Sequence, residues 1–210
     1  MCERGKETRD MEPPQSLQMN GLQSRTIRLT INPHADFREV IRILDAIVIP
    51  PFRVSNEHIR FAILELLNNS IRAHREKGES RDIWIDLSAL DGRFMVSVRD
   101  FGGGFDTSKL PYDLAADPRS LDLHSASFEE YQKQNGYKRF GMGIYVARKT
   151  FDEFRLIFLD ERDQPMTFHP GKTAGTLITL ALSMGADAAE PTPRKRGSDG
   201  ATGGEAAGGQ

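Results

Sequence analysis

The stretch RFMVSVRDFGGGFD, residues Arg93 to Asp106, joins an alternating apolar segment to an aspartate and a run of three glycines. Its residues Phe94, Val96 and Val98 recur at every second position, which is typical of a strand with one buried face. Each glycine raises the entropic cost of ordering the chain, so three in a row predict a sharp bend or a close approach to the main chain. The fold is therefore expected to place such a turn at the end of a buried strand.

The segments around this stretch predict an α+β domain. IWIDLSAL, residues 83–90, alternates in the same way, and Asp91-Gly92 between the two segments is a typical hairpin turn. Helical spacing of apolar residues predicts helices over 37–47, ended by Pro50, and over 57–76. Further patterns predict strands at 25–31, 154–160 and 175–182 and a helix at 141–151. Because consecutive strands are mostly linked by hairpins, the expected fold is a two-layer sandwich of helices on a mixed, mainly antiparallel sheet.

Both ends of the chain have the composition of disordered tails. Residues 1–24 are polar and without periodicity, and residues 185–210 mix Ala, Gly, Pro and charged residues. One domain is therefore expected at 25–184. Within it, residues 107–140 form a polar, irregular segment that is too long to serve only as a loop between two elements. We therefore expect this segment to be a lid over a binding site.

Composition disfavours several classes of partner. The 210 residues include 28 Lys and Arg against 30 Asp and Glu, so no overall basic field favours nucleic acid or an anionic membrane. Cys2 is the single cysteine, which excludes a disulfide framework and a cysteine-based metal site. No apolar run is long enough to cross a bilayer, and the first residues lack the apolar core of a signal peptide. A cytoplasmic protein without nucleic-acid or membrane partners is expected.

Three familiar phosphate motifs are only partly matched. DFG at Asp100 lacks the upstream glycine loop, strand lysine and catalytic loop of a protein kinase. FGMGIYVAR lacks the third glycine and the preceding buried strand of a dinucleotide-binding motif. Gly171-Lys172-Thr173 lacks the first glycine and the following helix of a P-loop. None of these three folds is predicted.

The helix FAILELLNNSIRAHRE has one broad apolar face and one narrow polar strip. Glu65 and Asn69 lie four residues apart on that strip, so their side chains lie one above the other. Taken alone, such a strip is most often the solvated edge of an amphipathic helix. The polar strip consists of His58, Glu65, Asn69, Arg72 and Glu76.

Four segments in this order, ELLNNSIRAH, RDFGGGFD, RFGMGIYVAR and GKTAGTLITLAL, resemble the asparagine box and the glycine boxes of the GHKL ATP-binding superfamily. That superfamily includes DNA gyrase, the large heat-shock chaperones and histidine kinases. The resemblance covers about residues 25–182 and implies the Bergerat ATP-binding fold, with ATP and Mg²⁺ as ligands.

The aspartate before the glycine run suits recognition of adenine. Asp100 can accept a hydrogen bond from the exocyclic amine of adenine and would repel the carbonyl that guanine has there, which selects ATP over GTP. By the resemblance, Gly102 and Gly104 let the backbone close around base and ribose, with Gly103 as an extra. Thr176 either completes the adenine contact through water or is an ordinary β-branched strand residue.

The resemblance also implies a phosphate end of the site. Asn69 offers a neutral oxygen to Mg²⁺, and Arg72 matches a basic residue that touches phosphate in the related kinases. Free N–H groups at the start of the next helix can receive phosphate oxygens, and two cations just before it either meet the γ-phosphate or are solvated. These residues are Gly141, Gly143, Lys138 and Arg139.

The stand-alone layout resembles the bacterial anti-sigma-factor serine kinases. In that group the asparagine-box glutamate, here Glu65, acts as the base on a serine of an antagonist protein. The implied partners are a sigma factor or antagonist protein, and the group commonly forms homodimers. The lid is longer than usual for the group, so two alternatives stay open: a non-catalytic ATP-dependent protein-binding switch, and a histidine-kinase-type ATPase domain acting in trans with a phosphotransfer protein.

Overall fold

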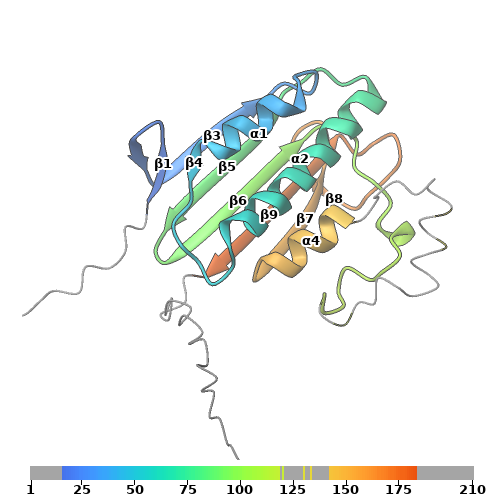
Figure 1. Ribbon diagram of the computed structural model, residues 1–210. Helices are drawn as coiled ribbons and strands as arrows, with labels where there is room; N and C mark the ends of the chain where they lie inside the picture. Colours follow the sequence, from blue (N-terminus) through green and yellow to red (C-terminus); the bar gives the residue numbers. More distant parts are fainter. Residues whose placement is uncertain (1–15, 119, 121–129, 131–132, 134–141, 184–210) are drawn as a thin grey trace, which may run out of the picture.

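The computed structural model describes residues 16–118, 120, 130, 133 and 142–183. In this part of the chain, three α-helices lie on one face of a six-stranded sheet (Figure 1). The helices are α1 (Phe37–Asp45), α2 (Asn56–Lys77) and α4 (Met142–Thr150), and a short 3-10 helix, η1 (Thr107–Lys109), follows the glycine run. The arrangement confirms the predicted α+β sandwich.

The sheet has the strand order β3-β5-β6-β9-β7-β8, and all of its described neighbours are antiparallel. Hairpins link β5 to β6 and β7 to β8, whereas β9 pairs between β6 and β7. The end of β6 therefore lies in the middle of the sheet, beside the start of β9. The strands are β3 (Thr26–Ile31), β5 (Ile83–Leu90), β6 (Arg93–Asp100), β7 (Glu153–Leu159), β8 (Pro165–Met166) and β9 (Gly175–Ser183).

Helix α2 forms where its sequence pattern predicts it. Ser55 caps its N-terminus by accepting a hydrogen bond from the His58 N–H, and Gly78 ends it in the left-handed conformation with φ of 70°. Its apolar stripe, which includes Ile63 and Leu67, is buried against the sheet. The opposite strip of α2 is left free to form a site beside α4.

The hairpin between β5 and β6 also follows its sequence. Asp91 and Gly92 both have positive φ, 50° and 71°, as a two-residue type I′ turn requires. Register then places Phe94, Val96 and Val98 on the buried face, in contact with the helices. Asp100 consequently ends β6 at the edge of the core.

Two boundaries differ from the prediction. Helix α1 ends at Asp45, before Pro50, because Ile47–Val48 leave the helix to form strand β4. Residues 17–24, predicted as part of a tail, form a hairpin of β1 (Leu17–Met19) and β2 (Leu22–Ser24) that pairs with β4. Leu17 is 0% exposed, so the domain begins before Arg25.

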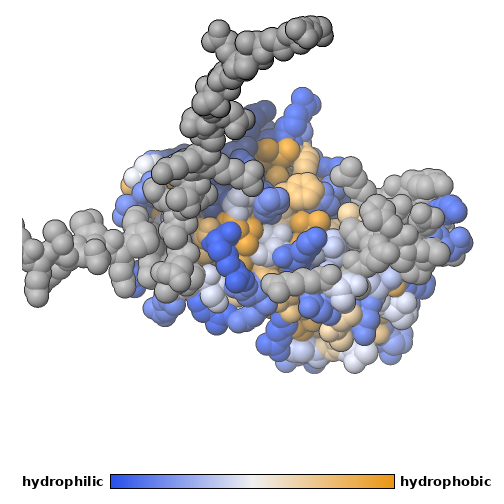
Figure 2. Space-filling model, turned by 60° about the horizontal axis from the view of Figure 1, so that its bottom comes forward, coloured by the Kyte–Doolittle hydropathy of each residue, from blue (hydrophilic) through white to orange (hydrophobic). Residues whose placement is uncertain are grey.

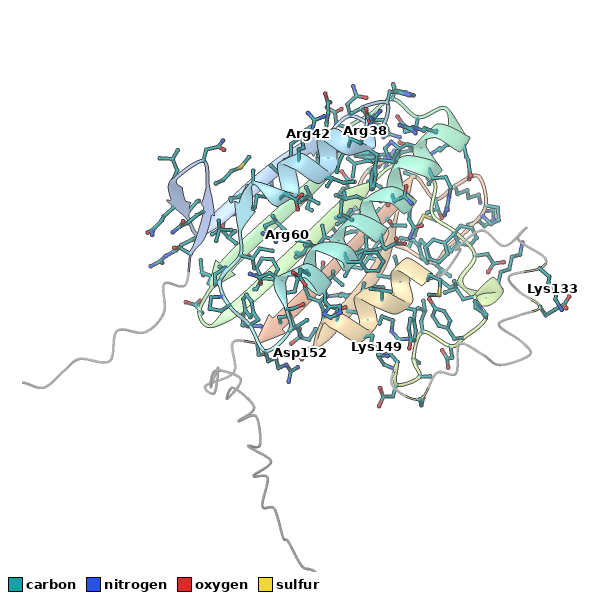
Figure 3. All side chains as sticks on the ribbon, in the orientation of Figure 1. Arg38, Arg42, Arg60, Lys133, Lys149 and Asp152 are labelled. Atoms are coloured by element: carbon teal, nitrogen blue, oxygen red, sulfur yellow. The ribbon has the colours of Figure 1, made fainter. Side chains whose placement is uncertain are left out.

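Charged side chains cover the outside of the helical layer. Arg38 and Arg42 are exposed on α1, while Arg60 of α2 donates a 2.8 Å hydrogen bond from Nη2 to the Ile47 carbonyl and ties α2 to the segment after α1 (Figure 3). The face seen in Figure 2 is largely hydrophilic, with apolar residues gathered near its middle. Over the described ranges, no helix has both the length and the apolar character that crossing a membrane requires.

Candidate functional site

A cavity of about 980 Å³ opens between α2, the glycine run after β6, the start of β9 and α4. Its volume is at the upper end of the range for sites that bind cofactors or other small molecules. Six of the predicted site residues line this cavity together, although they come from distant parts of the sequence. They are Asn69, Arg72, Asp100, Gly102, Gly104 and Thr176.

Asp100 is held in a fixed orientation at one end of the cavity. Its side chain is buried, with the residue 5% exposed, and its Oδ1 accepts a 2.8 Å hydrogen bond from the Gly102 N–H. Its Oδ2 accepts from the Thr176 hydroxyl and, at 3.4 Å, from the Ser70 hydroxyl. A carboxylate has about four lone-pair directions, so capacity remains for one further donor. Asp100 is thus a preoriented acceptor for a ligand group that donates a hydrogen bond.

Apolar side chains line the same cavity. Leu66, Ile144 and Ile178 line the cavity from α2, α4 and β9. Such walls suit a flat ring, while a single fixed carboxylate determines which edge of the ring faces inward. Binding of the base at Asp100 stays a prediction.

Each glycine of the run is required for its own reason. A β-carbon on Gly102 would lie 2.5 Å from the Ala73 β-carbon on α2, so this position must approach the helix closely. Gly103 and Gly104 have φ of 87° and 70°, a conformation that other residues rarely adopt. Gly103, predicted to be an extra, is therefore part of the turn itself.

Two residues of α2 that were not predicted as site residues hold the glycine segment. His74 Nε2 accepts a 2.8 Å hydrogen bond from the Phe101 N–H. One turn further on, Lys77 Nζ donates to the Phe101 carbonyl at 3.0 Å and to the Ala174 carbonyl at 3.1 Å. The sequence did contain a signal, because Ser70, His74 and Lys77 follow each other at helical spacing and therefore share a face.

The other end of the cavity is formed where α4 meets α2. A β-carbon on Gly143 would lie 2.7 Å from Asn69 Nδ2 and 3.1 Å from the Glu65 β-carbon. Glu65 and Asn69 are therefore both in direct contact with the first turn of α4. The N–H groups of that first turn have no partner within the helix, which makes this end suitable for anionic oxygens.

Cations and acids both line the wall between the two ends. Arg72 Nη2 donates a 3.2 Å hydrogen bond to Asn69 Oδ1, and its Nε lies 3.9 Å from Glu76 Oε1. Lys109 reaches the cavity from η1, whose N-terminus is capped by Asp106. Hydrogen bonds from Ser108 hold the pKa of the Asp106 carboxyl below its ordinary value, so Asp106 is charged at neutral pH.

Some predicted features lie outside the described residues. Lys138, Arg139 and Gly141 are among them, together with most of the expected lid. Their roles at the phosphate end therefore stay predictions.

Comparison with known protein families gives a match over most of this architecture. A family model described as histidine kinase-, DNA gyrase B-, and HSP90-like ATPase matches residues 55–185. The matched range is more than half of the chain and runs from the N-cap of α2 to just beyond β9. No curated protein matches the chain.

Proposed function

The chain belongs to the histidine kinase-, DNA gyrase B- and HSP90-like ATPase family, and on that premise we propose that it is a serine-protein kinase of the anti-sigma-factor type. Domains of this family bind ATP, usually with Mg²⁺. The observation that carries the proposal is that Glu65 and Asn69 stand one helical turn apart and both contact the start of α4 at Gly143. A candidate base and a candidate metal ligand therefore lie side by side where α2 meets α4. Asn69 lines the cavity, and Glu65, one helical turn away, is not among the described residues that line it.

The base-binding end supports adenine as the ligand. The free acceptor capacity of Asp100 fits the exocyclic amine of adenine, and the same carboxylate would face the carbonyl of guanine with two acceptors opposed. Thr176 and Ser70 both donate to Asp100 Oδ2, so neither side chain has to move for the carboxylate to be in place. We expect ATP to bind in preference to GTP for this reason.

Asn69 is suited to hold Mg²⁺ on the triphosphate. Its amide oxygen is a neutral ligand, which suits an ion that takes its anionic ligands from phosphate and keeps several waters. When bound, Mg²⁺ would offset negative charge on the β- and γ-phosphates. Arg72, which donates to the Asn69 oxygen, lines the same cavity and is proposed to contact a phosphate oxygen.

In the proposed reaction, the hydroxyl of a serine on an antagonist protein attacks the γ-phosphorus. A new oxygen–phosphorus bond forms, the bond to the β–γ bridging oxygen breaks, and ADP leaves with that oxygen. Glu65 accepts the proton of the attacking hydroxyl, and Lys138 or Arg139 is proposed to stabilise the charge of the transferring group. In this proposal the protein accelerates the transfer mainly by positioning the attacking hydroxyl against the γ-phosphate.

A non-catalytic switch is the second candidate, and one contact favours it. Arg148 on α4 donates hydrogen bonds to the carbonyls of Asp113 and Ala116. The first part of the predicted lid is thereby fixed to the helix whose other end forms the phosphate end of the site. Bound nucleotide could then change a protein-binding surface on the lid without any transfer.

Transfer of labelled γ-phosphate separates the two candidates. We expect label from Mg-ATP to appear on serine of a candidate antagonist protein, and we expect Glu65→Gln to abolish transfer while ATP binding, measured by calorimetry, stays intact. Glu57→Gln, at an exposed position on the same helix, is the matched control and should retain transfer. Equal labelling by Glu65→Gln would remove Glu65 from the mechanism, and tight ATP binding without transfer to any candidate would support the switch.

A further inference from the structure

The last two turns of α2 are bonded to the backbone of the glycine segment and to the segment before β9. His74 binds the Phe101 N–H, Lys77 binds the carbonyls of Phe101 and Ala174, and the Gly103 N–H donates to the same Ala174 carbonyl at 2.9 Å. One helix face thus fixes both backbone segments that flank Asp100 and Thr176. Of the two side chains, Lys77 also lines the cavity, whereas His74 lies behind the lining and acts on it through the backbone of Phe101.

The contact at His74 requires one particular form of the imidazole. Because Nε2 accepts the Phe101 N–H at 2.8 Å, it carries a lone pair, so the neutral ring has its proton on Nδ1. A proton added to Nε2 would point at the Phe101 N–H, and both groups would then be donors. Protonation of His74 is therefore incompatible with the observed position of Phe101.

The surroundings of His74 determine when that proton is taken up. His74 is 0% exposed, and burial lowers its pKa from the ordinary value of about 6.5. The carboxylates of Asp100 on β6 and Glu79 after α2, together with the Arg81 backbone, act in the opposite direction, whereas Lys77 adds to the lowering. The neutral form therefore prevails at neutral pH, and the contact is lost as the pH falls through the lowered pKa.

We propose that His74 is a positioning residue for nucleotide binding, which in its neutral form holds the Phe101–Gly103 segment in the shape that the base requires and releases that segment when it takes up a proton. The proposal rests on the proposed nucleotide-binding function. Lys77 acts with His74 by holding the carbonyl side of the same peptide segment. Since Gly102 also orients Asp100 through its N–H, release of the segment disturbs the acceptor for the base.

The test is the pH profile of Mg-ATP affinity in the full chain, measured by calorimetry from about pH 7.5 down to the pH at which nitrogen NMR shows the His74 ring protonated, which lies below the ordinary histidine pKa. In His74→Gln the side-chain amide oxygen can accept the Phe101 N–H at either pH. We expect the wild type to lose about tenfold more affinity on acidification than His74→Gln, because only the wild type loses this hydrogen bond. Protonation of ATP itself affects both proteins equally and cancels in the comparison.

Two further proteins complete the comparison. His74→Leu offers no acceptor and should bind about tenfold more weakly than the wild type at neutral pH, with the pH dependence of His74→Gln. His34→Gln changes an exposed histidine and should follow the wild-type profile. Coincident profiles for the wild type and His74→Gln would overturn the positioning role.

Failure of the proposed function gives a different result. If the folded wild type binds no ATP at either pH, nucleotide binding itself is refuted. The imidazole of the wild type can be observed independently by nitrogen NMR, where a proton on Nδ1 at neutral pH supports the proposal. A proton on Nε2 at neutral pH would refute it, whether or not the variants fold.

Discussion

Among the single residues of the site, Asp100 has a side chain that hydrogen bonds hold in one orientation before any ligand binds. Three donors fix its two oxygens, and two of them, Ser70 and Thr176, come from different elements. A ligand that uses the remaining acceptor capacity does not have to order this carboxylate, because folding has already done so. Asp100 is therefore a preformed acceptor, as the proposed recognition of adenine requires.

Gly143 provides a test of the phosphate end. A methyl group there would lie 2.7 Å from Asn69 Nδ2, the far end of a side chain that can swing away. The Glu65 β-carbon at 3.1 Å and the Glu65 carbonyl oxygen at 3.3 Å cannot swing away, so Gly143→Ala gains helix propensity of about 1 kcal/mol against this crowding, and urea unfolding measures the net change in stability. We expect the variant to lose most of the increase in ATP affinity that Mg²⁺ gives, measured by calorimetry with and without the ion.

The matched control for this prediction lies on the same helix. Lys149→Ala changes an exposed residue of α4 and should keep the full Mg²⁺ effect (Figure 3). An undiminished Mg²⁺ effect in Gly143→Ala would show that Asn69 does not hold the ion.

Some of the site residues could be predicted from the sequence, and others could not. Asn69 and Asp100 could be predicted because each supplies side-chain chemistry within a motif of recognisable order. For His74 and Lys77 the helical spacing with Ser70 was the only signal, because each bonds to the backbone of Phe101 and the sequence does not show which backbone groups a side chain meets. Gly103 was misjudged because the sequence does not show which glycine of a run takes positive φ.

Among the secondary-structure elements, α2 supports the largest share of the site. Its end is a Schellman motif, in which the Gly78 N–H donates to the Arg75 carbonyl at 3.3 Å and the Glu79 N–H to the His74 carbonyl at 2.9 Å. These two hydrogen bonds provide partners for the Arg75 and His74 carbonyls, which lie in the turn that carries His74 and Lys77. The conformation of Gly78 therefore keeps the last turn of the helix against the glycine segment.

Substitution at Gly78 tests this role of the helix end. Gly78→Ala places a side chain at φ of 70° with no atom within 4 Å of the new β-carbon, so the cost is backbone strain and not crowding. We expect the free energy of unfolding in urea to fall by about 1 kcal/mol. Ser80→Ala, at an exposed position two residues further on, should change it by less than about 0.5 kcal/mol. Equal stability of the two variants would contradict the role assigned to the motif.

Element boundaries were predictable where the causes are local. The start of α2 and the β5–β6 turn follow from Ser55 and from Asp91-Gly92, whose effects are confined to neighbouring residues. The end of α1 was misplaced because Ile47–Val48 pair with β1, nearly thirty residues earlier in the chain. Helical spacing alone favours continuing the helix, and a distant pairing decides otherwise.

Over the entire domain, the sheet and helices followed from the sequence, but the extent of the domain did not. The hairpin of residues 17–24 has strands of three residues each, too short for an alternating pattern to stand out. Its turn did carry a signal, since Asn20 and Gly21 have positive φ and Asn-Gly is a preferred hairpin turn. The three-stranded sheet of β2, β1 and β4 adds Leu17 to the common core.

If this hairpin is part of the domain core, Leu17 and Leu22 must differ sharply in their effect on stability. Leu17 is 0% exposed within the core cluster, whereas Leu22, in the paired strand, is 75% exposed. Leu17→Ala should lower the free energy of unfolding by about 3 kcal/mol, because it removes buried methyl groups and leaves a cavity. Leu22→Ala, the same chemical change in the same hairpin, should stay within about 0.5 kcal/mol of the wild type. Urea unfolding of the full chain measures both values, and a small effect for Leu17→Ala would return residues 17–24 to the N-terminal tail that their composition first indicated.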